Sequence, residues 1–256
     1  MPGNTIPAKT ILVINRDNGK LIKSWGDHLF MMPHSLTFDA ENNIWVTDVG
    51  LHQIFKFTHA GKLLLKLGEA KVAGNDSLHF NKPTDIAIAQ DGSFYVSDGY
   101  GNSRVIKFSA DGRYLFSWGT KGNEPGQFNT PHGIDLDKEG NVYVADRENN
   151  RIQIFDSTGK FIALWKNTVA EQLYSVTINK LNQEVFAVDY LTRLTLPVGS
   201  DILRLDTAFV LRERFGRSGT YDGPKARYHD IALDNEGSIY LADILSPNIY
   251  KFKKLK

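Results

Sequence analysis

The chain of 256 residues contains no cysteine, which excludes disulfide bonds, thiolate metal ligands and a cysteine nucleophile. Its 30 basic and 29 acidic side chains leave a formal net charge of +1, so no strong field would draw it to nucleic acid or to an anionic membrane surface. An apolar content of 41% predicts a single globular domain over residues 1–256, in which any metal ion would be held by nitrogen or oxygen ligands.

The first candidate strands are TILVIN and KLIKSWG, which lie within residues 10–26. The preceding segment lacks the charged and apolar regions of a signal peptide, and no apolar run reaches the length of a transmembrane helix. We therefore expect a soluble chain with no membrane partner. The compartment stays open, including secretion or the periplasm, because a removed leader would leave no trace. The oligomeric state is also open.

Five repeats follow, beginning near residues 31, 81, 129, 172 and 226. Each consists of short apolar runs separated by turns such as DG, EG, AG or TG, which is the pattern of consecutive antiparallel hairpins. In the third repeat these runs are GIDLD, NVYVAD, RIQIF and KFIALW. Four-stranded units that recur every 40 to 50 residues or so predict an all-β fold, the β-propeller, in which each repeat forms one blade.

The two ends of the chain bear on the number of blades. Residues 10–26 match the third and fourth strands of a repeat whose first two strands are missing, and the last repeat lacks its fourth strand. We therefore expect a six-bladed propeller whose first blade is incomplete, with residues 10–26 as its remnant.

Histidines recur at equivalent positions of alternate repeats. The first strands of the five repeats begin with His34, Thr84, His132, Tyr174 and His229. First strands line the propeller axis, so the three histidines would converge at one mouth of the ring. A histidine taken alone is more often a hydrogen-bonding cap, but three in one register predict a metal site. Three imidazoles with one open coordination position are typical of catalytic Zn²⁺.

Three further side chains are expected on the same face. Tyr100, Arg147 and Tyr190 follow the second strands of their repeats, and these strands return to the mouth that carries the histidines. A nearby cation would favour the phenolate of Tyr100, which would then serve as a general base, and Arg147 would bind a carboxylate. The alternatives are a packed aromatic side chain and a surface arginine.

A second cation site is suggested beside the histidines. Asp230 directly follows His229 and has no acidic counterpart in the other two histidine repeats. Its carboxylate, together with a backbone carbonyl such as that of Leu36, would suit Ca²⁺. A hydrogen bond from Asp230 to a histidine is the alternative.

Four segments carry a family resemblance. They are PHSLTFDAENNIWVTDVGLHQIFKF, KPTDIAIAQDGSFYVSDGYGNSR, PGQFNTPHGIDL with VADRENNRIQ, and HDIALDNEGSIYLAD. They resemble the catalytic core of peptidyl-α-hydroxyglycine α-amidating lyase, and the resemblance covers essentially the whole chain. That family is a six-bladed propeller of NHL repeats with a zinc ion on three histidines, an active-site tyrosine, substrate-facing arginines and a structural calcium ion.

The resemblance implies a role for each candidate residue. It implies zinc ligation by His34, His132 and His229, a base role for Tyr100 and a substrate-binding role for Arg147. It also implies calcium contacts from Asp230 and the carbonyl of Leu36. The implied reaction cleaves a peptidyl α-hydroxyglycine to a peptide amide and glyoxylate, so the expected partner is a small peptide-type substrate.

The chain departs from the family pattern in three places. The family normally has an N-terminal segment that completes the first blade and contributes another active-site arginine. We expect this chain to begin after that segment. Gly101 follows the tyrosine where vertebrate members have a cysteine, and Arg227 stands two residues before His229, where a methionine is expected near the substrate.

Two other functions are compatible with the same repeats. One is a non-catalytic NHL propeller that binds peptide or protein partners on the histidine face. The other is a metal-dependent hydrolase of the lactonase kind. RNA binding is disfavoured by the near-neutral charge.

Overall fold

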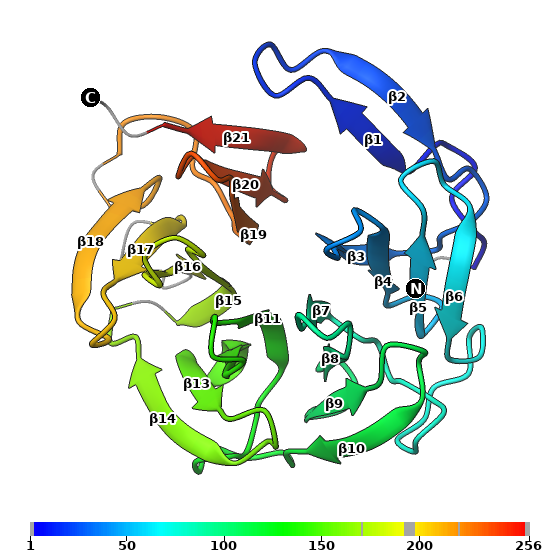
Figure 1. The fold of residues 1–256 in the computed structure, drawn as a ribbon. Coiled ribbons are helices and arrows are strands. Elements are labelled where there is room, and N and C mark those ends of the chain that lie inside the picture. Colours follow the sequence, from blue (N-terminus) through cyan, green and yellow to red (C-terminus); the bar gives the residue numbers. More distant parts are fainter. Residues whose placement is uncertain (1–2, 170, 192–197, 220, 254–256) are drawn as a thin grey trace.

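The strands form a ring of sheets around a central axis (Figure 1). This computed structural model describes residues 3–169, 171–191, 198–219 and 221–253. Within each sheet, neighbouring strands are consecutive in the chain and antiparallel, because short turns join them. The arrangement confirms the predicted all-β propeller.

Five of the sheets are blades. Blade 1 contains β3 (Pro33–Phe38), β4 (Ile44–Asp48), β5 (Gln53–Phe57) and β6 (Leu63–Leu67). Blade 2 contains β7 (Asp85–Ile88), β8 (Phe94–Asp98), β9 (Arg104–Phe108) and β10 (Tyr114–Trp118). Blade 3 contains β11 (Pro131–Leu136), β12 (Val142–Asp146), β13 (Arg151–Phe155) and β14 (Phe161–Lys166). Blade 4 contains β15 (Gln172–Ile178), β16 (Val185–Tyr190), β17 (Asp201–Leu205) and β18 (Leu211–Gly216). Blade 5 contains β19 (Tyr228–Leu233), β20 (Ile239–Asp243) and β21 (Asn248–Phe252).

The number of blades corrects the sequence prediction. The structure has five blades, not six with an incomplete first one. Residues 10–26 form instead a two-stranded sheet of β1 (Ile11–Ile14) and β2 (Leu21–Trp25). These strands pair with each other, and in the described ranges no third strand joins them. The hairpin therefore lacks the inner strands by which a blade reaches the axis.

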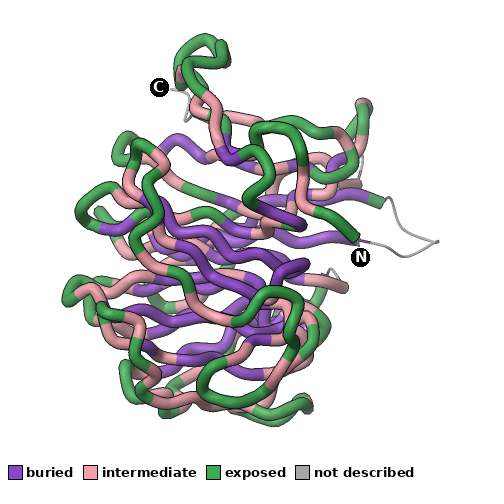
Figure 2. Tube along the Cα trace, turned by 90° about the vertical axis from the view of Figure 1, so that its right-hand side faces the viewer, coloured by how far each residue is buried: buried purple, intermediate pink, exposed green. Residues whose placement is uncertain are grey.

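Burial depends on the position of a strand within its blade. In blade 3, β12 and β13 are buried throughout, whereas β14 alternates between partly buried and exposed positions. The middle strands are covered on both faces by neighbouring blades, so they read as continuous apolar runs. The outer strand faces solvent on one side, which gives the alternation that the sequence shows. Figure 2 shows the resulting buried interior with exposed turns at its margins.

Apolar clusters fill the seams between sheets. Trp45 of blade 1 packs with Phe94 of blade 2, and similar clusters join blades 2 to 3, 3 to 4 and 4 to 5. A fifth cluster joins the β1–β2 hairpin to blade 1 through Ile11. Among the described residues, no such cluster joins blade 5 to the hairpin. An exposed ion pair between Arg16 and Glu236, 2.9 Å apart, connects them.

Helical structure is limited to one short turn in the described ranges. This 3₁₀ helix, η1 (Arg147–Asn149), follows β12 and ends at Asn150, whose φ of 53° is left-handed. No helix in the described part of the chain is long and apolar enough to span a membrane.

Candidate functional site

The three histidines occupy β-bulges at the start of the inner strands. In β3, the register with β4 shifts by one residue between Pro33 and Ser35, so His34 is the extra residue. Similar shifts occur between Pro131 and Ile134 in β11, a stretch that contains His132, and at His229 in β19. A bulge bends the strand and redirects the side chain at that point. The bulges thus turn three equivalent side chains toward the axis.

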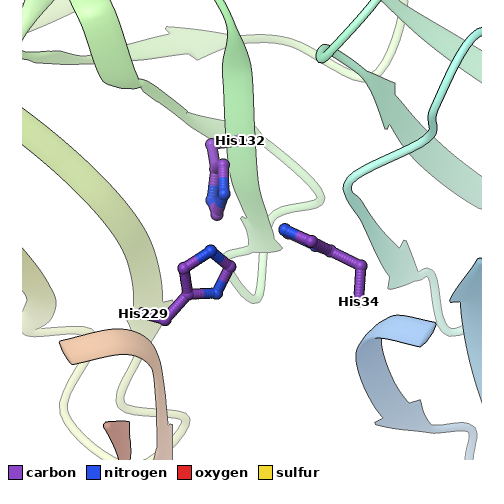
Figure 3. Close-up of side chains that lie close together, drawn as sticks. All are labelled: His34, His132 and His229. Atoms are coloured by element: carbon purple, nitrogen blue, oxygen red, sulfur yellow. The ribbon is translucent and has the colours of Figure 1, made fainter. Parts of the chain in front are cut away.

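The three imidazoles converge (Figure 3). Their ring centres are separated by 4.8 Å between His34 and His132 and by 4.7 Å for each of the other two pairs. The ligand nitrogens of His34, His132 and His229 all lie within 4.8 Å of one another. We call these residues the histidine triad. They are close enough to share one metal ion, as the repeat register predicts.

The neighbouring blade orients two of these rings. Nδ1 of His34 lies 2.6 Å from the carbonyl oxygen of Thr84, and Nδ1 of His132 lies 2.7 Å from that of Tyr174. A carbonyl oxygen only accepts hydrogen bonds, so each Nδ1 carries the proton and donates it. The Nε2 atoms of these two rings are therefore unprotonated and directed into the triad, so each is able to bind a metal ion.

The triad is also uncharged at neutral pH. Burial, reinforced by the positive charge of Arg147, lowers the pKa of His34 to about 4. Burial and then the charges of His34, Arg147 and Arg227 lower the pKa of His229 to about 3. Burial and then the positive charges of His34, His229 and Arg147 hold the pKa of His132 well below its ordinary value. No positive charge on an imidazole therefore has to be removed before a cation binds.

The phenol of Tyr100 points at the triad. Its Oη lies 2.9 Å from Nε2 of His34, 3.0 Å from Nε2 of His132 and 3.4 Å from Nε2 of His229. The structure therefore places Tyr100 where the sequence argument expects it, at the mouth of the ring and against all three imidazoles.

Local backbone packing explains this position. Tyr100 follows Gly99 directly after β8, and a Cβ added at Gly99 would lie 1.7 Å from the carbonyl oxygen of Pro131. Only glycine lets the loop approach blade 3 so closely. Burial raises the pKa of Tyr100 above its ordinary value of 10, although the adjacent Arg147 opposes this shift. Tyr100 is thus a neutral phenol at neutral pH unless more positive charge lies beside it.

Arg147 also lies at this mouth, on η1. Its Nη1 donates to Tyr100 Oη over 3.4 Å, and its guanidinium lies 5.2 Å from the ring centre of Tyr100. Its Nε and Nη2 lie 2.9 and 2.8 Å from a carboxylate oxygen of Glu148. Arg147 is therefore brought to the site, with part of its donor capacity already bound to a carboxylate.

Asp230 lies behind the triad. It lines a cavity of about 10 Å³ together with the three histidines and Ser35, Thr84, Asp85, Gly133 and Ser175. Its Oδ1 accepts hydrogen bonds from Ser175 Oγ at 2.7 Å and from the Ile231 backbone N–H at 2.9 Å. Leu36, with 41% of its surface exposed, is not among the described residues that line this cavity. The structure places Asp230 near the triad and does not bring Leu36 into the same cavity.

Sequence reasoning missed two residues here. Tyr174 occupies the bulge of β15, and its ring centre lies 5.2 Å from those of both His132 and His229. The sequence does indicate this position, because Tyr174 begins the first strand of its repeat as the three histidines begin theirs. Asp85 lines the same cavity as Asp230, and it directly follows the register residue Thr84 as Asp230 follows His229, which was the available signal.

Comparison with known proteins identifies the repeats and the relatives. The NHL repeat model matches residues 30–57, 80–108 and 128–155. Peptidyl-glycine alpha-amidating monooxygenase A of Xenopus laevis is 38% identical over 273 residues, covering 98% of this chain and 28% of that protein. Peptidyl-alpha-hydroxyglycine alpha-amidating lyase 1 of Drosophila melanogaster is 33% identical over 266 residues, covering 96% of this chain and 49% of that protein. The chain spans less than half the length of either relative.

A solved structure supports the fold. A catalytically inactive variant of virginiamycin B lyase from Staphylococcus aureus superposes with a TM-score of 0.63 at 18% identity, covering 93% of this chain and 75% of the other. At this identity the likeness concerns the fold alone. The chain is therefore a β-propeller that contains NHL repeats, and its sequence is similar to proteins named peptidyl-α-hydroxyglycine α-amidating lyases.

Proposed function

We propose that this chain cleaves peptidyl α-hydroxyglycines to peptide amides and glyoxylate. The observation that carries the proposal is the approach of Tyr100 Oη to within 2.9 to 3.4 Å of all three Nε2 atoms of the histidine triad. A candidate base is thereby placed against a candidate metal centre. The names of relatives such as the Drosophila lyase support the same reaction.

We propose further that the histidine triad holds Zn²⁺. The donor set fits, because the ligand nitrogens of three neutral imidazoles lie within 4.8 Å of one another, and His34 and His132 present an unprotonated Nε2. When bound, the ion supplies Lewis-acid stabilisation of negative charge on the substrate oxygen. Its positive charge would also favour the phenolate of Tyr100 and so suit this residue to the role of a base.

The proposed chemistry needs one proton acceptor and one bond cleavage. Tyr100 Oη takes the proton of the substrate hydroxyl, and the hydroxyl oxygen becomes the aldehyde oxygen of glyoxylate. The carbon–nitrogen bond breaks as this carbonyl forms, and its electron pair goes to the amide nitrogen. The nitrogen takes up a proton to give the peptide amide, so the reaction neither gains nor loses protons overall.

Arg147 is the proposed ligand for the carboxylate of the α-hydroxyglycine. This carboxylate is attached to the carbon that bears the hydroxyl, so it must lie close to Tyr100. Arg147 contacts Tyr100 through Nη1, the nitrogen that Glu148 does not bind. A charge-assisted hydrogen bond from Nη1 would fix the anionic end of the substrate.

Calcium at Asp230 is a further proposal. Burial raises the pKa of both Asp230 and Asp85, and the charge of Asp230 adds to the shift at Asp85. A hard divalent cation between two buried carboxylates would offset that repulsion. A ligand role for the carbonyl of Leu36 stays a prediction.

Glyoxylate release tests the lyase proposal. Purified protein loaded with zinc should release glyoxylate from an N-acylated α-hydroxyglycine, and a chelator should stop the release. The exposed His59, changed to Ala, serves as a control that should keep full turnover. Absence of glyoxylate from a folded protein that contains zinc would contradict the proposal, and turnover of lactones instead would point to a hydrolase.

A further inference from the structure

Arg227 is a cation without an acidic partner at the edge of the site. Three other partly or fully buried arginines are paired with aspartates: Arg104 with Asp98, Arg151 with Asp146, and Arg214 with Asp189. Among the described residues no carboxylate binds the guanidinium of Arg227; the carboxylate of Asp243 accepts only from its backbone N–H, at 2.9 Å. Its Nε donates to Tyr174 Oη at 3.1 Å, its Nη2 donates to the same oxygen, and its guanidinium lies 4.7 Å from the ring centre of Tyr190.

A directional chain of hydrogen bonds holds this guanidinium in place. Tyr174 Oη donates to Gln172 Oε1 at 2.9 Å, and Gln172 Nε2 donates to Glu148 Oε1 at 2.9 Å. Because its proton is committed to Gln172, Tyr174 Oη can only accept from Arg227. The same Glu148 oxygen accepts from Arg147, so the chain joins the two arginines of the site. Nη1 of Arg227 donates to none of the described residues and is left for a ligand.

The two arginines hydrogen-bond different tyrosines of the site. Arg147 hydrogen-bonds Tyr100, whereas Arg227 hydrogen-bonds Tyr174, whose ring centre is 5.2 Å from that of His229. A substrate held with its hydroxyl at Tyr100 places its own carboxylate near Arg147. A group that meets Arg227 then belongs to another part of the substrate.

We propose that Arg227 binds a carboxylate side chain on the residue that precedes the α-hydroxyglycine. The chain then prefers substrates with aspartate or glutamate at that position. The inference rests on the proposed lyase function and names its substrate class. A hydrogen bond between two charged groups in a partly buried site contributes enough to change kcat/KM by about tenfold or more.

Matched substrates test this preference. N-acetyl-Asp-α-hydroxyglycine and N-acetyl-Asn-α-hydroxyglycine differ in charge and hardly in shape. We expect the zinc-loaded protein to favour the aspartyl compound about tenfold or more in kcat/KM, and Arg227→Met to remove the difference. Arg217→Met is the control, because Arg217 also lies against a tyrosine, 4.1 Å from the ring centre of Tyr250, and should leave the preference intact.

Two kinetic outcomes would overturn the inference. One is equal kcat/KM for the two compounds in the unmodified protein. The other is an Arg227→Met variant that lowers kcat/KM equally for both, which would assign Arg227 to the carboxylate that both compounds share.

A binding measurement separates this inference from the lyase proposal. N-acetyl-Asp-Gly and N-acetyl-Asn-Gly lack the hydroxyl and cannot be cleaved, so calorimetry reports their affinity alone. Tighter binding of the aspartyl peptide, lost in Arg227→Met, supports the inference even if no glyoxylate is released in the kinetic assay. Equal binding of the two peptides overturns it, even if both α-hydroxyglycine compounds are cleaved.

Discussion

The Nδ1 atom of His132 lies 2.7 Å from the carbonyl oxygen of Tyr174, a residue of the next blade. The ring of His132 is therefore oriented by a strand that is not its own. His34 is held in the same way by Thr84. A site built in this manner depends on the seams between blades as much as on the histidines themselves.

Removing one histidine should remove the metal. Zinc bound by two remaining imidazoles is much weaker than zinc bound by three. Elemental analysis of His132→Ala should therefore fall from one zinc ion per chain to almost none. The exposed His59→Ala should retain the ion. Equal zinc content in both variants would place the ion elsewhere in the molecule.

The seam beside His132 can be tested through Gly133. A Cβ added there would lie 2.7 Å from Cα of Ser175 and 3.1 Å from the carbonyl oxygen of Tyr174. We expect Gly133→Ala to lower the free energy of unfolding by about 1–3 kcal/mol, because overpacking pushes blades 3 and 4 apart. It should also weaken zinc binding, because the carbonyl that orients His132 moves. Gly3→Ala, where an added Cβ meets no atom within 4 Å, is the control.

Loss of one hydroxyl separates chemistry from metal binding. Tyr100→Phe keeps the ring but removes the oxygen that faces the three Nε2 atoms. We expect kcat to fall roughly 100-fold or more, the usual contribution of a general base, with zinc content unchanged. Turnover at the original rate would assign the base role to another group.

Acid stability should depend on Asp39. Burial tends to raise its pKa, but hydrogen bonds from Lys56, Trp45 and Asn43 outweigh burial and hold the pKa at about 2. The folded-state value lies below the ordinary 3.8, so this carboxylate stabilises the fold above about pH 4 and the stabilisation is lost as the pH falls toward 2.

The loss amounts to about 2 kcal/mol of unfolding free energy. Urea unfolding between pH 7 and pH 2 measures it. Asp39→Asn should be less stable at pH 7 and should show a shallower decline below pH 4. The exposed Asp27→Asn should follow the unmodified protein, and an unchanged pH profile in Asp39→Asn would contradict the assignment.

The repeat register predicted the convergence of the histidines because equivalent positions of equivalent blades must lie on one circle. The bulges could not be predicted in this way. His34 and Thr84 each precede the aspartate that ends the next strand, Asp48 or Asp98, by fourteen positions. A bulge is found at His34, whereas the pairing of β7 with β8 begins only at Asp85. Equal spacing along the chain therefore does not predict whether the paired strands contain a β-bulge or where it lies.

The blade count failed for a related reason. TILVIN and KLIKSWG have the pattern of outer strands, and they do pair. A local pattern specifies a hairpin, whereas a blade requires inner strands from elsewhere. The contacts that join Arg227 to Glu148 were also beyond prediction, because they link different repeats through side chains that share no periodic pattern.

The ion pair between Arg16 and Glu236 spans the one seam for which the described residues offer no apolar filling. Exposed pairs of this kind contribute at most about 1 kcal/mol, whereas each large apolar side chain buried at another seam contributes about 1.5–3 kcal/mol. The contact between blade 5 and the β1–β2 hairpin is therefore the weakest in the ring of sheets. Local unfolding on heating will start there, so the amide protons of β1, β2 and β21 will exchange earliest. His229 lies in blade 5, next to that contact. We therefore expect its bond to a bound ion to weaken before those of His34 and His132.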